Sequence, residues 1–130
     1  SLVSKMENNK LLAKANQFFE SYNTVNIKSL EELVSDDIHW EHHNRFKGQG
    51  KKGLMQSIRD FAKKAPGRYF SERTRWAING EIVFTEHKWH AVPVAAVPSF
   101  GWTEGVPVTM DCCALLVFKD GKIIEYSDYA

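Results

Sequence analysis

The Asp120-Gly121 pair constrains the fold of this chain more than any other feature of its sequence. It lies between two strand-like runs, and an Asp-Gly pair in that setting predicts a tight β-hairpin, because both central turn residues need a positive φ. The second run alternates, which places Asp128 on the same strand face as Ile124 and Tyr126. A carboxylate on a mostly apolar face costs free energy unless it has a partner or a task. The closing strand therefore carries the first candidate functional residue.

Helical signals fill the first half of the chain. Apolar residues recur at three- and four-residue spacing from Met6 to Tyr22, and Asn26 is placed to cap a second helix that begins at Ile27. A third helix is expected over residues 51–65, ended by Pro66-Gly67. Between the second and third helices we expect a turn at residues 35–37, a strand over 38–46 and a loop at 48–50.

Strands in hairpins are predicted for the second half. They cover residues 68–78, 81–91, 108–118 and 122–129, and Asn79-Gly80 is a second hairpin turn. Residues 93–107 form a long connection with Pro and Gly that carries Phe100 and Trp102, which is typical of a lid or an interface arm. This order of elements predicts an α+β fold, in which a curved antiparallel sheet has about three helices packed on one face.

Composition limits the class of protein. The 130 residues predict one domain, 1–130, in which residues 1–5 are expected to be disordered or foreign to the domain. A net charge of +1 gives no reason to expect nucleic acid or a membrane surface as a partner. The adjacent cysteines, Cys112 and Cys113, fit neither a disulfide framework nor a zinc motif, so we expect a reducing, cytoplasmic setting.

Strand alternation gathers one set of chemically useful side chains on a single face of the predicted sheet. An aspartate beside histidines in an apolar cavity can do acid–base work, because burial raises the pKa of a carboxyl group whereas a nearby imidazolium lowers it. The residues predicted to be catalytic are Asp128, His42 and His87. Those predicted to contact a substrate are Trp40, Trp89, Tyr126, Met110 and Cys112.

Structural roles compete with these assignments. Asp128 could be bound to a backbone amide or an arginine, and the two histidines could be satisfied core residues. A cluster of His39, His42 and His43 suggests a metal site, but strand alternation lets at most two of them converge, so no metal is expected.

Four segments together resemble the NTF2-like superfamily, and within it the SnoaL-like and limonene-epoxide-hydrolase-like proteins, which share the ketosteroid-isomerase-like cone. The resemblance covers nearly the whole chain, and the order and spacing of the segments carry it. The segments are Asp36-Asp37-Ile38-His39-Trp40, Phe46-Lys47-Gly48, residues 79–86 and residues 120–129.

This resemblance implies a cone-shaped fold with a deep, mostly apolar pocket and an acid at Asp128, where Tyr126 replaces the usual tryptophan of the closing signature. The residues that support epoxide hydrolysis in such proteins are replaced by His87, Trp89, Trp40 and His42, which disfavours that reaction.

The resemblance and the residues together predict a cofactor-independent acid–base enzyme of the isomerase, cyclase or dehydratase type. It would act on a small, apolar carbonyl compound, polyketide-like or steroid-like, and form a homodimer. The alternative is a non-catalytic module that binds a small ligand or another protein, because a fold does not fix a function.

Overall fold

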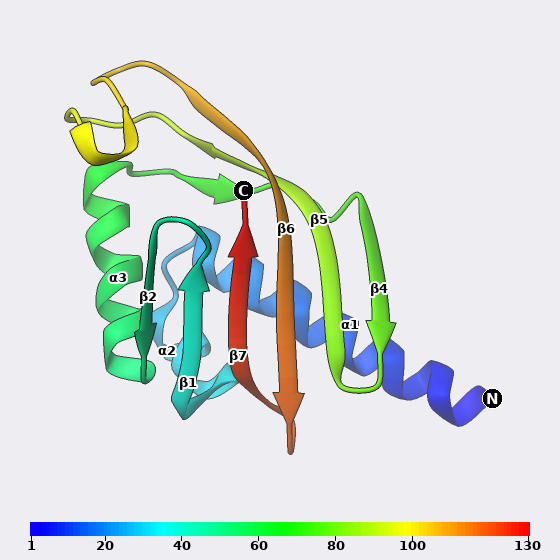
Figure 1. Cartoon of the computed structure of the whole chain (residues 1–130). Coiled ribbons are helices and arrows are strands. Elements are labelled where there is room, and N and C mark those ends of the chain that lie inside the picture. Colours follow the sequence, from blue (N-terminus) through cyan, green and yellow to red (C-terminus); the bar gives the residue numbers. More distant parts are fainter.

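One curved sheet and three α-helices make up the fold (Figure 1). The computed structural model describes residues 1–130. The helices are α1 (Leu2–Asn23), α2 (Ile27–Leu33) and α3 (Lys51–Lys64), with a 3-10 helix η1 (Pro98–Phe100). The strands are β1 (Val34–His42), β2 (Phe46–Gln49), β3 (Tyr69–Phe70), β4 (Arg75–Asn79), β5 (Ile82–Ala91), β6 (Val108–Lys119) and β7 (Lys122–Tyr129).

The sheet is mixed rather than purely antiparallel. Its strand order is β2-β1-β7-β6-β5-β3, with β4 also paired to β5. All pairings are antiparallel except that of β1 with β7, which brings the first and last strands of the chain together in parallel. The predicted α+β fold with a curved sheet and helices on one face is confirmed, and the parallel pairing is the feature that the hairpin pattern did not reveal.

The hairpin at Asp120-Gly121 is confirmed. Both residues have positive φ, 50° and 77°. The strand that follows contains an irregularity, because Phe118 pairs with Ile123 while Val117 pairs with Glu125. The extra residue shifts the alternation, so Ile123 is fully buried in place of the expected Ile124.

Two predicted strands are interrupted. β1 begins at Val34 and includes the residues 35–37 that were expected to turn, and the chain then breaks at residues 43–45, where Asn44 takes a φ of 67°. Gly48 and Gln49, expected in a loop, belong to β2. The predicted strand over 68–78 is divided into β3 and β4 by residues 71–74, which stay tied to β5 through hydrogen bonds to Glu86 and Lys88.

The helices cover the inner face of the sheet with the predicted apolar stripe. Ala15, Phe18, Phe19 and Tyr22 of α1 are buried against the strands. Figure 1 shows the first turns of α1 extending past the edge of the sheet. Asn26 caps α2 as expected, since its Oδ1 accepts the Ser29 N–H at 3.1 Å.

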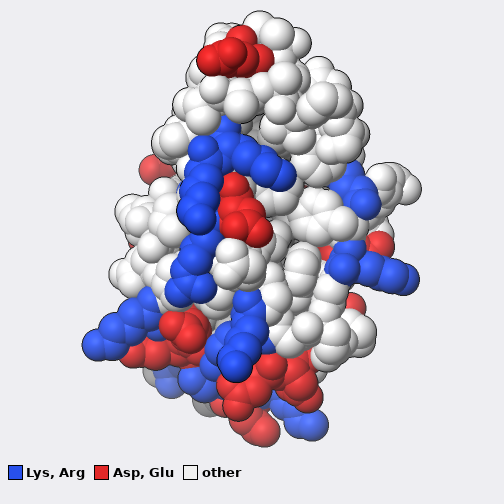
Figure 2. All heavy atoms as spheres, turned by 90° about the vertical axis from the view of Figure 1, so that its left-hand side faces the viewer, with Lys and Arg blue, Asp and Glu red and all other residues white.

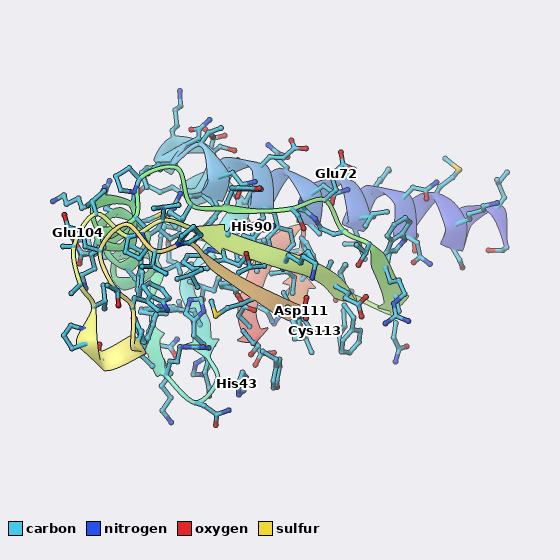
Figure 3. The ribbon with its side chains drawn as sticks, turned by 90° about the horizontal axis from the view of Figure 1, so that it is seen from above. His43, Glu72, His90, Glu104, Asp111 and Cys113 are labelled. Atoms are coloured by element: carbon cyan, nitrogen blue, oxygen red, sulfur yellow. The ribbon has the colours of Figure 1, made fainter.

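The two faces of the sheet differ as the alternation predicted. In Figure 3, His43, Asp111 and Cys113 lie on the side of the sheet that faces away from α1. Buried strand residues such as Thr85, Trp89 and Cys112 alternate with these and face the helices. No helix is both long and apolar enough to span a membrane.

Candidate functional site

A cavity lies between the inner face of the sheet, helix α3 and the loop at residues 93–107. Its lining is mostly hydrophobic, and it is narrow: about 50 Å³ is open to the centre of a water molecule, within about 650 Å³ of unfilled space that includes the opening. A single water needs roughly 10–15 Å³ by the first measure, so the cavity as it stands has room for a few waters.

Asp128 lies in the wall of this cavity, on β7 beside β1. The pairing sets His42 opposite Asp128 and Trp40 opposite Tyr126. The Tyr126 hydroxyl donates a hydrogen bond of 2.9 Å to Oδ2 of Asp128. Nδ1 of His42 lies 3.7 Å from the same oxygen, which is longer than a hydrogen bond. Oδ1 of Asp128 has no hydrogen-bond partner, although it is buried.

Burial sets the protonation of this pair. It raises the pKa of Asp128 to about 6, although the Tyr126 hydrogen bond and the charge of Arg45 both act to lower that pKa. Burial, followed by the charges of Arg45 and His43, lowers the pKa of His42 to about 4. Near neutral pH the site therefore contains an ionised Asp128 beside an uncharged His42.

Two neighbouring groups remain protonated. Burial and the charge of Asp128 raise the pKa of Tyr126 well above its usual value, so its hydroxyl stays a hydrogen-bond donor to the carboxylate. The same two causes raise the pKa of the Cys112 thiol to about 12. Cys112 is therefore a small apolar wall residue and not a nucleophile.

Tyr22 supplies a polar group that the sequence did not predict in the site. Nε1 of Trp89 donates to its hydroxyl oxygen at 3.0 Å, and an indole N–H can only donate, so the Tyr22 hydrogen remains free for a ligand. The fully buried guanidinium of Arg68 lies over the Tyr22 ring, 4.0 Å from its centre. All three guanidinium nitrogens lack a hydrogen-bond partner.

Most of the predicted site residues line the cavity together. They are Asp128, His42, Trp89, Tyr126, Met110 and Cys112. The structure does not bring the remaining two to the cavity wall. The His87 ring packs against Phe19 and Phe70, with 4.7 Å between ring centres in each case, and both of its nitrogens lack partners. Trp40 packs on Gly48 and donates to the Gly50 carbonyl at 3.2 Å.

The loop at residues 93–107 closes one end of the cavity. Phe100 and Trp102 both line it, Phe100 stacks on Phe61, and Trp102 stacks on Trp89. Figure 2 views the side of α3, where basic side chains run along the molecule, while the end formed by this loop carries few charges. This placement supports the lid interpretation of the loop.

Sequence signals for the unpredicted residues were weak. Tyr22 is the last residue of the buried stripe of α1. Because a buried tyrosine needs a partner for its hydroxyl group, the sequence contained a signal for a polar group at this position. Arg45 and Arg68 lie in short connections without a motif. No group of three or more His, Cys, Asp or Glu side chains is arranged to hold a metal ion.

The geometry provides a base, a hydrogen-bond donor and an apolar enclosure. Asp128, whose Oδ1 is buried without a hydrogen-bond partner, and Tyr22, whose hydroxyl hydrogen is unused, both line one cavity. A carboxylate base and a hydroxyl donor are what removal of a proton beside a carbonyl group requires.

Solved structures of several proteins share this architecture. A candidate polyketide cyclase from Xanthomonas campestris pv. campestris superposes with a TM-score of 0.82 at 13% identity, covering 94% of this chain and 90% of that one. A candidate SnoaL-like polyketide cyclase from Jannaschia sp. CCS1 gives 0.80 at 11% identity, with 92% and 84% covered. An LEH-like epoxide hydrolase from M. tuberculosis gives 0.74 at 16% identity, with 93% and 82% covered.

At these identities the structural likeness establishes the fold alone. Among curated proteins, none matches the sequence. The family profile of the SnoaL-like domain matches residues 15–126, which is most of the chain and includes the cavity-lining part of α1 and all strands up to Tyr126. The chain therefore belongs to the SnoaL-like domain family.

Proposed function

We propose that this protein is a cofactor-independent acid–base enzyme of the isomerase, cyclase or dehydratase type that acts on a small, mostly apolar carbonyl compound. One observation carries the proposal: Asp128 is buried in an apolar cavity with Oδ1 unpartnered and a pKa of about 6. Such a carboxylate is ionised at neutral pH and is a stronger base than an exposed aspartate.

The reaction begins with the substrate carbonyl oxygen at the Tyr22 hydroxyl. Asp128 removes a proton from the carbon next to the carbonyl, and the electron pair of that C–H bond moves onto the carbonyl oxygen. Tyr22 stabilises the resulting enolate by hydrogen bonding. In a substrate with a β,γ double bond, return of the proton from Asp128 to the γ-carbon isomerises it. Attack of the enolate carbon on a second carbonyl closes a ring, and the new alkoxide takes the proton from Asp128. Loss of a β-hydroxyl group, which leaves as water with the proton from Asp128, dehydrates the substrate.

His42 serves Asp128 as the route for protons between the site and solvent. Its side chain is 25% exposed whereas that of Asp128 is 6% exposed, and the two groups lie 3.7 Å apart. The proton is more stable on Asp128, whose pKa is about 6, than on His42, whose pKa is about 4, so His42 carries a proton only in passing between Asp128 and solvent.

The lid interpretation of residues 93–107 agrees with this chemistry. Phe100 and Trp102 keep water away from the enolate and leave only a narrow space inside. A ligand larger than a few waters must therefore displace these rings on entering, which favours flat substrates that slide between aromatic faces.

Exchange of α-protons for deuterium tests the proposal directly. The probe is 2-tetralone, a flat, uncharged ketone, and proton NMR in D₂O measures its exchange with and without the protein. The wild type should accelerate exchange above buffer, and Asp128→Asn should lose roughly 10²–10⁴-fold of that rate.

Asp111→Asn provides the matched control, because Asp111 is exposed on the outer face of the sheet and should leave exchange unchanged. If the wild type and Asp128→Asn bind 2-tetralone equally and neither exchanges its protons, the enzyme proposal fails and the non-catalytic binding module takes its place.

A further inference from the structure

Arg45 is a cation at the opening of the cavity that has no acidic partner. It lies in the connection between β1 and β2 and lines the cavity beside Phe46. No carboxylate lies within ion-pair distance of its guanidinium, in contrast to Arg75, which is paired with Glu86. Its one polar contact is Nη2 to Sδ of Met110 at 3.4 Å, and a thioether is a weak acceptor.

That contact fixes where the charge lies. Met110 is on the inner side of β6 and lines the same cavity, so the exposed Arg45 side chain reaches across the opening toward β6. The charge also acts on both members of the acid–base pair, since it lowers the pKa of Asp128 and of His42. Arg45 therefore faces the reacting end of the cavity from its rim.

The surroundings of the guanidinium are suited to one kind of ligand group. Arg45 shares the cavity lining with the aromatic residues Phe46, Phe61, Phe100 and Trp102 and with Ala130, and Asn44 and Ser99 line the adjoining surface hollow. A guanidinium binds a carboxylate through two parallel hydrogen bonds, and it tolerates aromatic neighbours better than an ammonium group does. A single cation balances one negative charge, and the nearby Asp128 carboxylate disfavours a ligand group with two.

We propose that Arg45 binds a carboxylate on the substrate, so that the substrate class is flat, apolar, enolisable carbonyl compounds that carry a carboxylate at the end that lies at the opening. The inference rests on the proposed function, because it adds a second anchor to the cavity in which Asp128 and Tyr22 act. The apolar body fills the space between the aromatic rings, and the carboxylate stays at the rim.

Two ligands of nearly equal shape, one charged and one neutral, distinguish the contribution of the carboxylate charge to affinity from that of the apolar ring. The probes are 2-naphthoate and its neutral amide, 2-naphthamide, and isothermal titration calorimetry measures both affinities. The wild type should bind 2-naphthoate about tenfold more tightly than 2-naphthamide, the size of one charge-assisted contact at a partly exposed site. Arg45→Gln should abolish this preference, while Lys47→Gln, an exposed cation on β2, should retain it.

Three results would overturn the proposal: equal affinities of the wild type for the two probes, a preference that survives in Arg45→Gln, or no binding of 2-naphthoate by the wild type. The exchange of 2-tetralone is a separate readout because that ketone has no carboxylate. Loss of the naphthoate preference with tetralone exchange intact removes the Arg45 inference alone, whereas the preference without exchange removes the proposed function alone.

Discussion

The raised pKa of the Asp128 carboxyl group makes the stability of the fold depend on pH. An aspartate in the unfolded chain has a pKa near 3.8, whereas burial raises that of folded Asp128 to about 6. Between these two values the unfolded state has released its proton and the folded state has not. The free energy of unfolding therefore falls as pH rises across this window, and the loss persists above pH 6.

Asp128→Asn should accordingly stabilise the protein at pH 8 by on the order of 2 kcal/mol, and by progressively less as the pH falls toward 4. Chemical denaturation at several pH values measures this difference. Glu104→Gln, an exposed change in the loop, should show no such pH-dependent gain. A gain for Asp128→Asn that is the same at pH 4 and pH 8 would contradict the raised pKa.

Catalysis should increase where stability decreases. Because only the ionised carboxylate can act as the base, the exchange rate of 2-tetralone should rise through pH about 6 and level off above it. NMR exchange rates between pH 5 and 8 check this. A rate that falls as pH rises through 6 would show that the protonated group is the active form.

Removing the Tyr22 hydroxyl should lower the rate of 2-tetralone exchange more than it lowers the stability of the fold. Tyr22→Phe removes the hydroxyl that would bind the carbonyl oxygen, and loss of one such donor typically lowers a rate about 10²-fold. Tyr129→Phe is the control, since Tyr129 is 48% exposed and stacks on His43 outside the cavity. Equal exchange by Tyr22→Phe and the wild type would remove Tyr22 from the mechanism.

Some strand pairings could be predicted from the sequence and others could not. The β6–β7 hairpin is local, so its Asp-Gly turn and alternation were sufficient to place Tyr126 and Asp128 on one face. The pairing of β1 with β7 is not local, and no pattern in either strand distinguishes a parallel from an antiparallel neighbour. His42 could therefore be predicted on the right face, while its position directly opposite Asp128 could not.

Two further structural features could not be predicted from the sequence: the extended conformation of residues 35–37 and the position of His87 outside the cavity. Ser and Asp favour turns, and residues 35–37 lie in an irregular stretch of β1, between its pairs Val34–Ile123 and His39–Glu125, so the chain runs on extended there without regular pairing of its own. His87 has the inner-face alternation of its strand, as predicted, but α1 covers that part of the sheet and separates it from the cavity. Alternation gives the face of a residue, whereas which helix covers it depends on the whole fold.

The Trp40 ring packs against two glycines, Gly48 of strand β2 and Gly53 of helix α3. Only Gly48 lacks room for a side chain. A Cβ on Gly48 would lie 2.2 Å from the Trp40 ring, whereas one on Gly53 would lie 3.3 Å from it. Gly48→Ala should therefore lower the free energy of unfolding by about 1–3 kcal/mol.

Gly53→Ala is the matched substitution and should be close to neutral, because Gly53 lies within α3, where alanine favours the helix. Thermal unfolding of the two variants compares them. Equal destabilisation would mean that the Trp40 ring can move away from either site.

At the scale of the whole molecule, the open outer face of the sheet has two parts. Glu86, Lys88 and Asp111 form a polar part with ion pairs to neighbouring strands. Phe84 and Leu115, paired across β5 and β6, form an apolar part. Phe84 is 37% exposed. This apolar part is where the predicted homodimer would meet, and the dimer itself stays a prediction.

Light scattering tests the assembly. The wild type should be a dimer, and Phe84→Ser with Leu115→Ser should give a monomer. The comparison is Val94→Ser with Val106→Ser, two exposed positions on the 93–107 loop, which should leave the dimer intact. If the loop variant dissociates and the sheet variant does not, the loop is the interface arm.

The parallel pairing of β1 with β7 also determines when the site can form during folding. His42 and Asp128 lie on the first and last strands of the chain, and bringing segments so distant in sequence together costs loop-closure entropy. A growing chain can form α1, α2 and the early hairpins well before β7 is made. Asp128 therefore reaches its place beside His42 only when β7 pairs with β1.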